Sequence, residues 1–226
     1  GSLNLWRLSA GNIMDHHVLE PHSDRTTVQL FNRGRQLVSQ EDKEQEALDM
    51  MTKVVGRFAR HAQAYERRGF VNLRLNNLED AIYDYDKSLN INPSMPESHY
   101  GRGIAYLRKK DWEKAALDFE AVTKNSIPHQ AIYWMAQVAL GDSYLELGRP
   151  ADALRVFNMF SKRKQRIASL DRYDRRINNV FGTLLVKAGR YYYATIAFYK
   201  ALASFADVKA PSVSQVRYEL WLAYHF

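Results

Sequence analysis

The chain has 226 residues, of which 46% are hydrophobic and 25% charged, with a formal net charge of +7 and no cysteine. The near-average apolar content, with only 11 glycines and 6 prolines, excludes collagen-like, low-complexity and disordered classes. The lack of cysteine excludes disulfides, thiolate metal sites and cysteine nucleophiles. No apolar run approaches the ~18 residues of a membrane span. The start at Gly1, without Met, indicates a soluble piece of a longer protein.

Residues 1–25 belong to no repeat and are predicted to form an N-terminal arm. From residue 26 to 209 one pattern occurs five times: a glycine, then an alanine, then a large side chain four residues after the alanine. Three columns that move together define a repeat, which must be sought before local structure. The glycines are Gly34, Gly69, Gly103, Gly141 and Gly182; the alanines are Ala47, Ala81, Ala115, Ala153 and Ala194; the large side chains are Met51, Tyr85, Phe119, Phe157 and Phe198.

Each repeat is predicted to be a pair of antiparallel helices. In the second repeat, apolar residues recur at helical spacing until the pattern breaks at Asn76. A second stripe of apolar residues follows and ends at Pro93. Small residues at Gly69 and Ala81 let the two backbones approach, and Tyr85 fills the groove beside them. One such hairpin cannot enclose its apolar face, so the hairpins must stack in an array.

The third and fourth glycine spacings, 38 and 41 residues, exceed the basic 34 by amounts close to one and two helical turns. We therefore expect longer helices around 128–147 and 170–188. The alternative is a loop insertion in SKRKQRIASLDRY. After Pro211 the residues of 210–226 are predicted to form a capping helix or the first helix of a truncated sixth repeat.

These columns resemble the tetratricopeptide repeat (TPR) family. The resemblance implies an all-α fold, an α–α superhelix in which TPR hairpins form a solenoid, with the first helix of each pair lining a concave groove for a peptide or helix of a partner protein. The residues that carry it are Tyr65, Gly69, Ala81, Tyr85 and Pro93; Gly103, Tyr106, Ala115 and Phe119; Gly141, Tyr144, Leu147, Gly148, Ala153 and Phe157; Gly182, Gly189, Tyr191, Ala194, Phe198 and Ala201; and, more weakly, Leu30, Gly34, Leu37, Ala47 and Met51.

Partner-binding candidates lie one turn either side of each glycine, on the face away from its own second helix. Aromatic and aliphatic side chains interleaved with arginine suit binding hot spots. The alternative for each is packing between repeats or against residues 1–25. The candidates are Phe31, Arg35, Val38, Glu66, Phe70, Arg74, Tyr100, Ile104, Arg108, Val138, Asp142, Leu145, Asn179, Thr183 and Lys187.

A subfamily of these repeats binds acidic chaperone tails through a clamp of Lys, Asn and Arg. Asn32 and Arg67 lie at suitable positions, but Glu66, Phe70 and Tyr100 stand where the clamp needs other residues. Ile104 fails in the same way, so this role is not expected.

The positive charge concentrates in one basic patch, which could contact an acidic partner or could be a solvated turn diluted by Asp171 and Asp174. Nucleic acid is not expected as a partner, because no recognition module or aromatic interleaving accompanies the charge. The patch consists of Lys162, Arg163, Lys164, Arg166, Arg172, Arg175 and Arg176.

The sequence lacks phosphate-binding loops, nucleophile elbows and zinc or calcium motifs, so neither an enzyme nor a cofactor or metal site is predicted. The predicted function is a non-enzymatic scaffold that docks a protein segment and supports assembly of a complex. The alternatives are a self-associating structural array and a basic-patch adaptor. We expect a cytoplasmic protein, with the bacterial periplasm or the cytoskeleton and cilium as alternatives.

Overall fold

The computed structural model describes residues 21–40, 42–163, 167–203, 216–219 and 221. Within these ranges the regular secondary structure is entirely helical, which confirms the predicted all-α class. The chain divides into two compact units, unit 1 with residues 1–111 and unit 2 with residues 112–226. None of the described helices combines the length and the apolarity needed to cross a bilayer.

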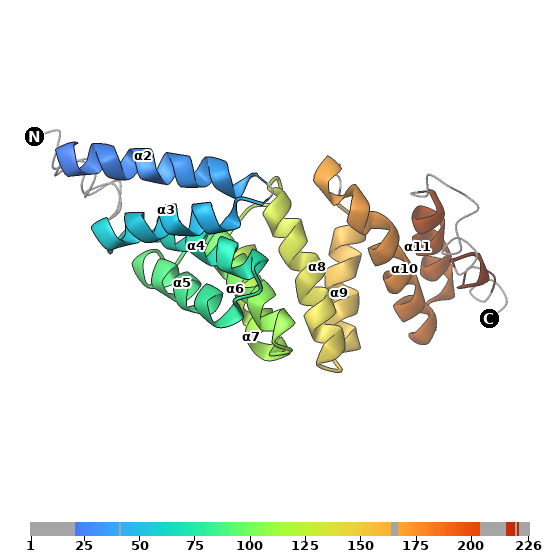
Figure 1. The fold of residues 1–226 in the computed structure, drawn as a ribbon. Helices are drawn as coiled ribbons and strands as arrows, with labels where there is room; N and C mark the ends of the chain where they lie inside the picture. Colours follow the sequence, from blue (N-terminus) through green and yellow to red (C-terminus); the bar gives the residue numbers. More distant parts are fainter. Residues whose placement is uncertain (1–20, 41, 164–166, 204–215, 220, 222–226) are drawn as a thin grey trace, which may run out of the picture. The chain divides into compact units, whose positions relative to one another are not determined.

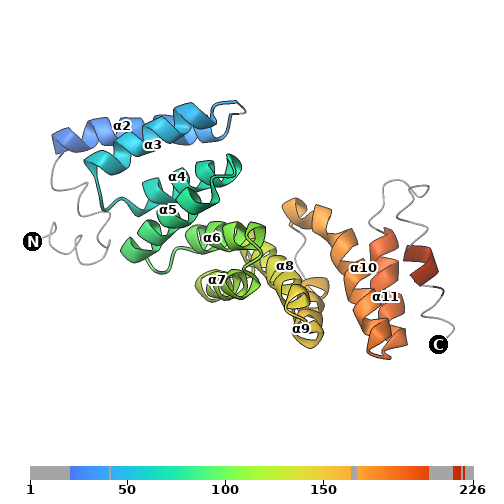
Figure 2. The same cartoon turned by 60° about the horizontal axis from the view of Figure 1, so that its bottom comes forward.

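Unit 1 is built from antiparallel helical hairpins. Helix α2 (Pro21–Val38) packs on α3 (Glu44–Arg57), and α4 (Ala62–Arg74) packs on α5 (Leu78–Ile91), as Figures 1 and 2 show. Helix α6 (Pro96–Arg108) contacts both α4 and α5. Because α4 also contacts α2, the first helices α2, α4 and α6 form one layer and α3 and α5 form the other.

Glycines at the helix crossings let bulky side chains lie against the neighbouring backbone. A Cβ on Gly69 would lie 3.1 Å from the Tyr85 ring, and one on Gly34 would lie 2.8 Å from Cε of Met51. A Cβ on Gly101, in α6, would also collide with Tyr85. The buried Tyr85 ring therefore lies between two successive first helices, which confirms the predicted close packing and extends it to the next repeat.

The turn between the two helices of a hairpin contains a residue in the left-handed conformation. Asn76 has φ 62° and Lys110 has φ 60°, whereas Gly148 and Gly189 both have φ 68°. Such a residue ends a helix by turning the chain back on its last carbonyls. The break predicted at Asn76 is therefore confirmed.

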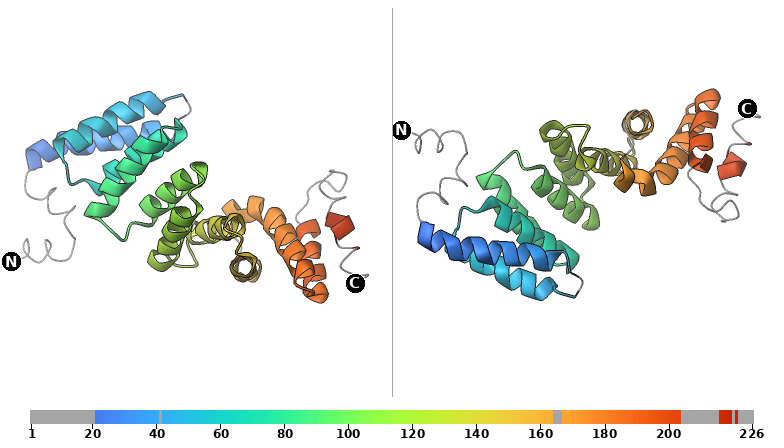
Figure 3. Two further views of the ribbon diagram at one scale, coloured as in Figure 1. Left: turned by 90° about the horizontal axis from the view of Figure 1, so that it is seen from below. Right: turned by 90° about the horizontal axis from the view of Figure 1, so that it is seen from above.

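Unit 2 continues the hairpin architecture. Helix α7 (Trp112–Asn125) packs on α8 (Ala131–Glu146), and α8 packs on α9 (Pro150–Ser161). Helix α10 (Asp171–Lys187) contacts α9 and pairs with α11 (Tyr191–Ala203), and both views in Figure 3 show α10 and α11 side by side. The same glycine packing recurs, because a Cβ on Gly182 would lie 2.5 Å from the Phe198 ring.

The first helices α8 and α10 of unit 2 are longer than α4 and α6 of unit 1. Helices α4 and α6 have 13 residues each, whereas α8 has 16 and α10 has 17. A short 3-10 helix (Ala168–Leu170) precedes α10. The added residues lie before the glycine, at the N-terminal end of each helix, so the buried stripe keeps its position. The prediction of longer helices is confirmed.

The ends of the repeat region differ from the sequence expectation or lie partly outside the described residues. Helix α2 begins at Pro21, five residues before the predicted start of the repeats at residue 26. The rest of the predicted N-terminal arm, residues 1–20, lies outside the described residues. Residues 216–219 and 221 are helical, as predicted for the segment after Pro211. The division of the chain into arm, five hairpins and final helix stays a prediction.

Candidate protein-binding surfaces

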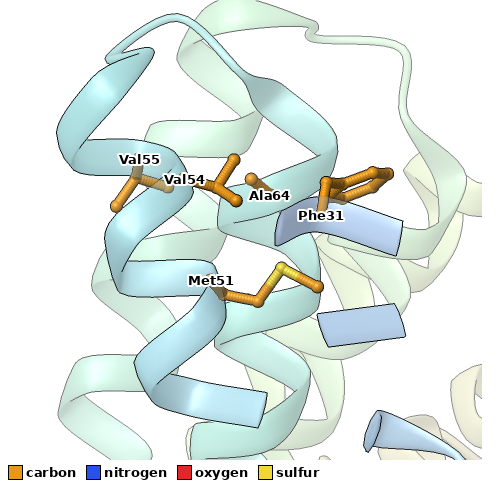
Figure 4. Close-up of a cluster of buried hydrophobic side chains, with 5 residues drawn as sticks. All are labelled: Phe31, Met51, Val54, Val55 and Ala64. Carbon is orange, nitrogen blue, oxygen red and sulfur yellow. The ribbon is translucent and has the colours of Figure 1, made fainter. Parts of the chain in front are cut away.

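Phe31 lies in the core that joins α2, α3 and α4, although its position suggested contact with a partner. Its exposed fraction is 9%, and it packs with Met51, Val54 and Ala64 (Figure 4). The centroid of its ring lies 4.7 Å from that of His61. Burying an aromatic ring stabilises the stack of the first two hairpins, so Phe31 acts in packing here.

Glu66, on α4, is buried at 4% exposure. Nε of the adjacent Arg67 lies 3.1 Å from its carboxylate. Burial raises the pKa of Glu66 to about 7, while the Arg67 charge lowers it and the Glu97 charge raises it. Near neutral pH this carboxyl group therefore exchanges between its neutral and charged forms within the layer of first helices.

Arg74 and Arg108 tie successive first helices together. Nη1 of Arg74 donates to the carbonyl oxygen of Val38 at 2.7 Å, and Nη1 of Arg108 donates to that of Leu73 at 2.5 Å. Arg74 also forms an ion pair with Glu44. Both arginines were predicted to face a partner, and the fold uses them to bind carbonyl groups near the C-terminus of the preceding first helix.

Apart from the buried candidates and the two arginines that bind carbonyl groups of the preceding repeat, four candidates of unit 1 remain, and they define what we call the first-helix face: Arg35, Phe70, Tyr100 and Ile104. Arg35 is exposed, and its guanidinium lies 5.9 Å from the ring centroid of Phe31. Phe70 is 37% exposed. Tyr100 and Ile104 are half-buried. These residues come from α2, α4 and α6, three helices of one layer.

In unit 2 the predicted binding residue Asp142 is engaged by another helix. Nη1 and Nη2 of Arg176 donate to its two carboxylate oxygens at 2.9 and 2.8 Å, so the pair joins α8 to α10. Sequence spacing had assigned Asp142 to the groove and Arg176 to the basic patch. The remaining candidates are the buried Val138, the half-buried Leu145, Asn179 and Thr183, and the exposed Lys187.

The described members of the basic patch do not form one free cationic surface. Arg163 forms an ion pair with Asp174 at 2.6 Å, and its guanidinium lies 4.2 Å from the ring centroid of Phe160. Its side chain is only 9% exposed. Lys162 and Arg175 are exposed. Three members lie beyond what is described: Lys164, Arg166 and the side chain of Arg172.

Sequence reasoning missed a pocket of about 490 Å³ on unit 2, which we call the α9–α11 pocket. It lies between the second helices α9 and α11, over side chains of α10. The signal in the sequence is the run of tyrosines at 191–193 between the cations Arg190 and Lys200. The pocket is lined by Ala151, Leu154, Arg155, Asn158, Ser161, Lys162, Phe181, Leu185, Arg190, Tyr193, Ile196, Ala197 and Lys200.

Acidic and histidine side chains are dispersed over the described part of the chain. Three His, Cys, Asp or Glu side chains do not come together anywhere in it as a metal site would require. The buried carboxylate of Asp84 stabilises the fold. It accepts hydrogen bonds from Nη2 of Arg68 at 2.6 Å and from Nδ2 of Asn72 at 3.0 Å.

Family models identify the repeats. A model described as TPR repeat matches residues 69–110, and one described as Tetratricopeptide repeat matches residues 100–164. The predicted resemblance is therefore confirmed over residues 69–164.

Solved structures share the fold. YrrB, described as a TPR protein with an unusual peptide-binding site, is 22% identical with a TM-score of 0.63, over 77% of this chain and 82% of that one. Pseudomonas aeruginosa pilF is 15% identical with a TM-score of 0.65, over 89% and 90%. MamA from Desulfovibrio magneticus RS-1 is 17% identical with a TM-score of 0.63, over 79% and 94%. These likenesses confirm the predicted α–α superhelix class.

A curated relative matches part of the chain. The mouse protein DnaJ homolog subfamily C member 7 is 31% identical over 85 residues. The match covers 37% of this chain and 17% of the mouse protein, so it spans a small part of that relative's length.

Proposed function

From the tetratricopeptide repeats that residues 69–164 contain, we propose that the chain is a non-enzymatic interaction scaffold. It binds a peptide or helix of a partner protein on the first-helix face of unit 1 and so supports assembly of a multiprotein complex. Layers of parallel first helices offer extended surfaces to which protein segments bind. YrrB, which shares the fold, is described as having a peptide-binding site.

The observation that carries the proposal is the exposure of Phe70. The next residue of α4, Val71, is 1% exposed and Leu73 is 7% exposed, so α4 buries apolar side chains that closely follow Phe70 in sequence. Phe70 itself is 37% exposed, on the layer that also presents Arg35 and Tyr100. An exposed aromatic side chain among arginine and tyrosine has the composition of a binding hot spot.

The charge around Phe70 favours a partner segment that offers both apolar and hydrogen-bonding groups. On the two helices that flank α4, Arg35 of α2 supplies a cation, and Glu97, at the start of α6, is exposed. Glu66 lies between them in the same layer and changes its charge near neutrality. Tyr100 adds a large ring at little cost in conformational entropy.

Substitution of Phe70 by Ala tests the proposal against a matched exposed aromatic. Tyr83, on the second helix α5, is 55% exposed and lies under the ammonium of Lys87 at 5.2 Å. Affinity capture from extracts of the source organism, quantified by mass spectrometry, should lose a specific partner roughly tenfold or more with Phe70→Ala. Tyr83→Ala should retain it. Equal recovery by both variants and the unchanged chain would reject the first-helix face as the binding surface.

A further inference from the structure

The α9–α11 pocket has an apolar base that is already covered by the fold. Phe181 and Leu185 of α10 and Ala197 of α11 line it and are 7%, 2% and 1% exposed. Tyr193 and Ile196 also line it, but they are 50% and 40% exposed. The pocket therefore offers a sheltered apolar base next to apolar side chains that still face solvent. Its volume of about 490 Å³ lies in the range that accommodates ligand groups.

The charge of this pocket has one sign. Four of its lining residues are cations, and none is acidic: Arg155, Lys162, Arg190 and Lys200. Low-dielectric walls focus the field of such a cluster, so it attracts carboxylates more strongly than the same charges spread over a flat surface.

Two of these cations are already partly engaged. Nζ of Lys200 donates to the carbonyl oxygen of Ser161 at 2.9 Å, so it serves to hold α11 against the end of α9. The guanidinium of Arg190 lies 4.8 Å from the ring centroid of Tyr193, a cation–π contact that orients the arginine.

Arg155 retains most of its binding capacity. Its contact with Asp152 is long, at 3.5 Å, and Arg149 holds the same carboxylate at 2.7 Å. The Arg155 side chain is 66% exposed. A guanidinium carries five N–H donors in a planar fork that matches a carboxylate, so Arg155 can bind a further anion.

The apolar surface extends beyond the pocket along both second helices. Tyr192, one turn before Ile196 on α11, is 73% exposed. Met159, one turn after Arg155 on α9, is 41% exposed. Residues four apart on a helix are surface neighbours, so both side chains lie beside the pocket. A small anion would leave this surface uncovered, whereas a protein segment would cover it.

We propose that the α9–α11 pocket binds an acidic protein segment in which carboxylate side chains flank a large apolar side chain. The apolar side chain enters the pocket over Phe181 and Leu185. The flanking carboxylates bind Arg155 on one side and Arg190 on the other. This surface lies on second helices and is separate from the first-helix face, so the chain carries two binding surfaces of different chemistry.

Fluorescence anisotropy with a labelled synthetic hexapeptide, Glu-Asp-Leu-Phe-Asp-Glu, tests the proposal on the full chain. Charge reversal by Arg155→Glu or Arg190→Glu should weaken binding roughly tenfold or more, because each removes a charge-assisted contact and adds repulsion. Tyr193→Ala should weaken it through lost apolar contact. A peptide with serine in place of Leu and Phe should bind much more weakly.

Two control variants separate this site from other causes. Lys124→Glu makes a cation-to-glutamate change at an exposed position of α7 in unit 2 that does not line the pocket, and it should leave binding unchanged. Phe70→Ala should also leave it unchanged, which distinguishes failure here from failure of the first-helix proposal. Circular dichroism shows whether each variant is folded. If Arg190→Glu is misfolded, the binding measured with Arg155→Glu tests the proposal.

Absence of binding to the unchanged chain would overturn the proposal. Unaltered binding in Arg155→Glu, or an equal loss in Lys124→Glu, would overturn it as well. Complete competition by millimolar inorganic phosphate, with equal binding of the serine peptide, would show an anion site that does not select a protein segment.

Discussion

At the scale of single residues, Glu66 links folding to pH. Its pKa is about 7 in the folded chain and 4.5 for the free side chain, because burial disfavours the charged form. At pH values between these two pKa values, the folded state binds more protons than the unfolded state. The stability that this group contributes is therefore fully present below pH 4.5 and is lost as the pH rises through 7.

Substitution of Glu66 by Gln should remove this loss. We expect the free energy of unfolding at pH 8 to rise by up to about 3 kcal/mol, with little change at pH 5, since the neutral amide carries no charge to desolvate. Urea unfolding at both pH values measures the difference. Glu97→Gln removes a charge that raises the pKa of Glu66, so it should give a smaller rise at pH 8 in the same direction. A uniform effect of Glu66→Gln at pH 5 and pH 8 would contradict the account.

Sequence spacing predicted which face of a helix each candidate occupies but could not predict its depth. Phe31 and Glu66 each stand three residues before a repeat glycine, and both are buried. Arg35 and Phe70 each stand one residue after the glycine, and both are exposed, because the neighbouring helices cover one of these positions and not the other. Arg74 shows the same limit, since its carbonyl acceptor belongs to Val38 in the preceding repeat.

At the scale of elements, the contact between a glycine and an aromatic ring sets the distance between the helices of a hairpin. In the repeat of α8 and α9, a Cβ on Gly141 would collide with the ring of Phe157, which is fully buried. The glycine column of the sequence predicted this contact correctly. The lengthening of α8 and α10 was also predictable, because insertions close to whole turns preserve the buried face.

Gly141→Ala should therefore lower the free energy of unfolding by about 1–3 kcal/mol, the usual cost of overpacking. The second change Phe157→Leu should recover part of that loss by making room for the methyl group. Gly56→Ala is the control: no atom lies within 4 Å of a Cβ at this position in α3, and it should gain about 0.5 kcal/mol of helix propensity. Thermal and urea denaturation measure all three. A neutral Gly141→Ala would contradict this packing.

Contacts between side chains of different repeats could not be predicted from the sequence. Asp142 and Arg176 are 34 residues apart, and only the register of α10 on α8 brings their side chains together. Likewise, the α9–α11 pocket arises from side chains of three helices at positions outside the repeated columns of the sequence. Periodicity predicts the helices, whereas the distances between their side chains follow from how the hairpins stack.

At the scale of the whole molecule, the extensive contacts of the described helices are with helices close to them in sequence. These pairs run from α2 with α3 to α10 with α11, and steps such as α4 with α6 skip one helix. In such a chain, stability is approximately a sum of local terms and nearest-neighbour interfaces. A local defect should therefore remain local.

Asp84→Ala tests this locality. It removes the carboxylate that Arg68 and Asn72 bind and leaves the Arg68 charge half-buried, at a cost of about 3 kcal/mol. Hydrogen exchange followed by mass spectrometry should show lost protection in α4 and α5, with α10 and α11 unchanged. Equal loss in all helices would indicate one cooperative core and contradict the account.

The most direct test of the central claim, binding on the first-helix face of unit 1, is site-specific photocrosslinking. Benzoylphenylalanine replaces Phe70 in one variant and Tyr83 in another, and both are irradiated in extracts of the source organism. The account predicts a discrete adduct with one partner protein at position 70 and none with that partner at position 83. The same adduct at position 83, or none at position 70, would contradict it.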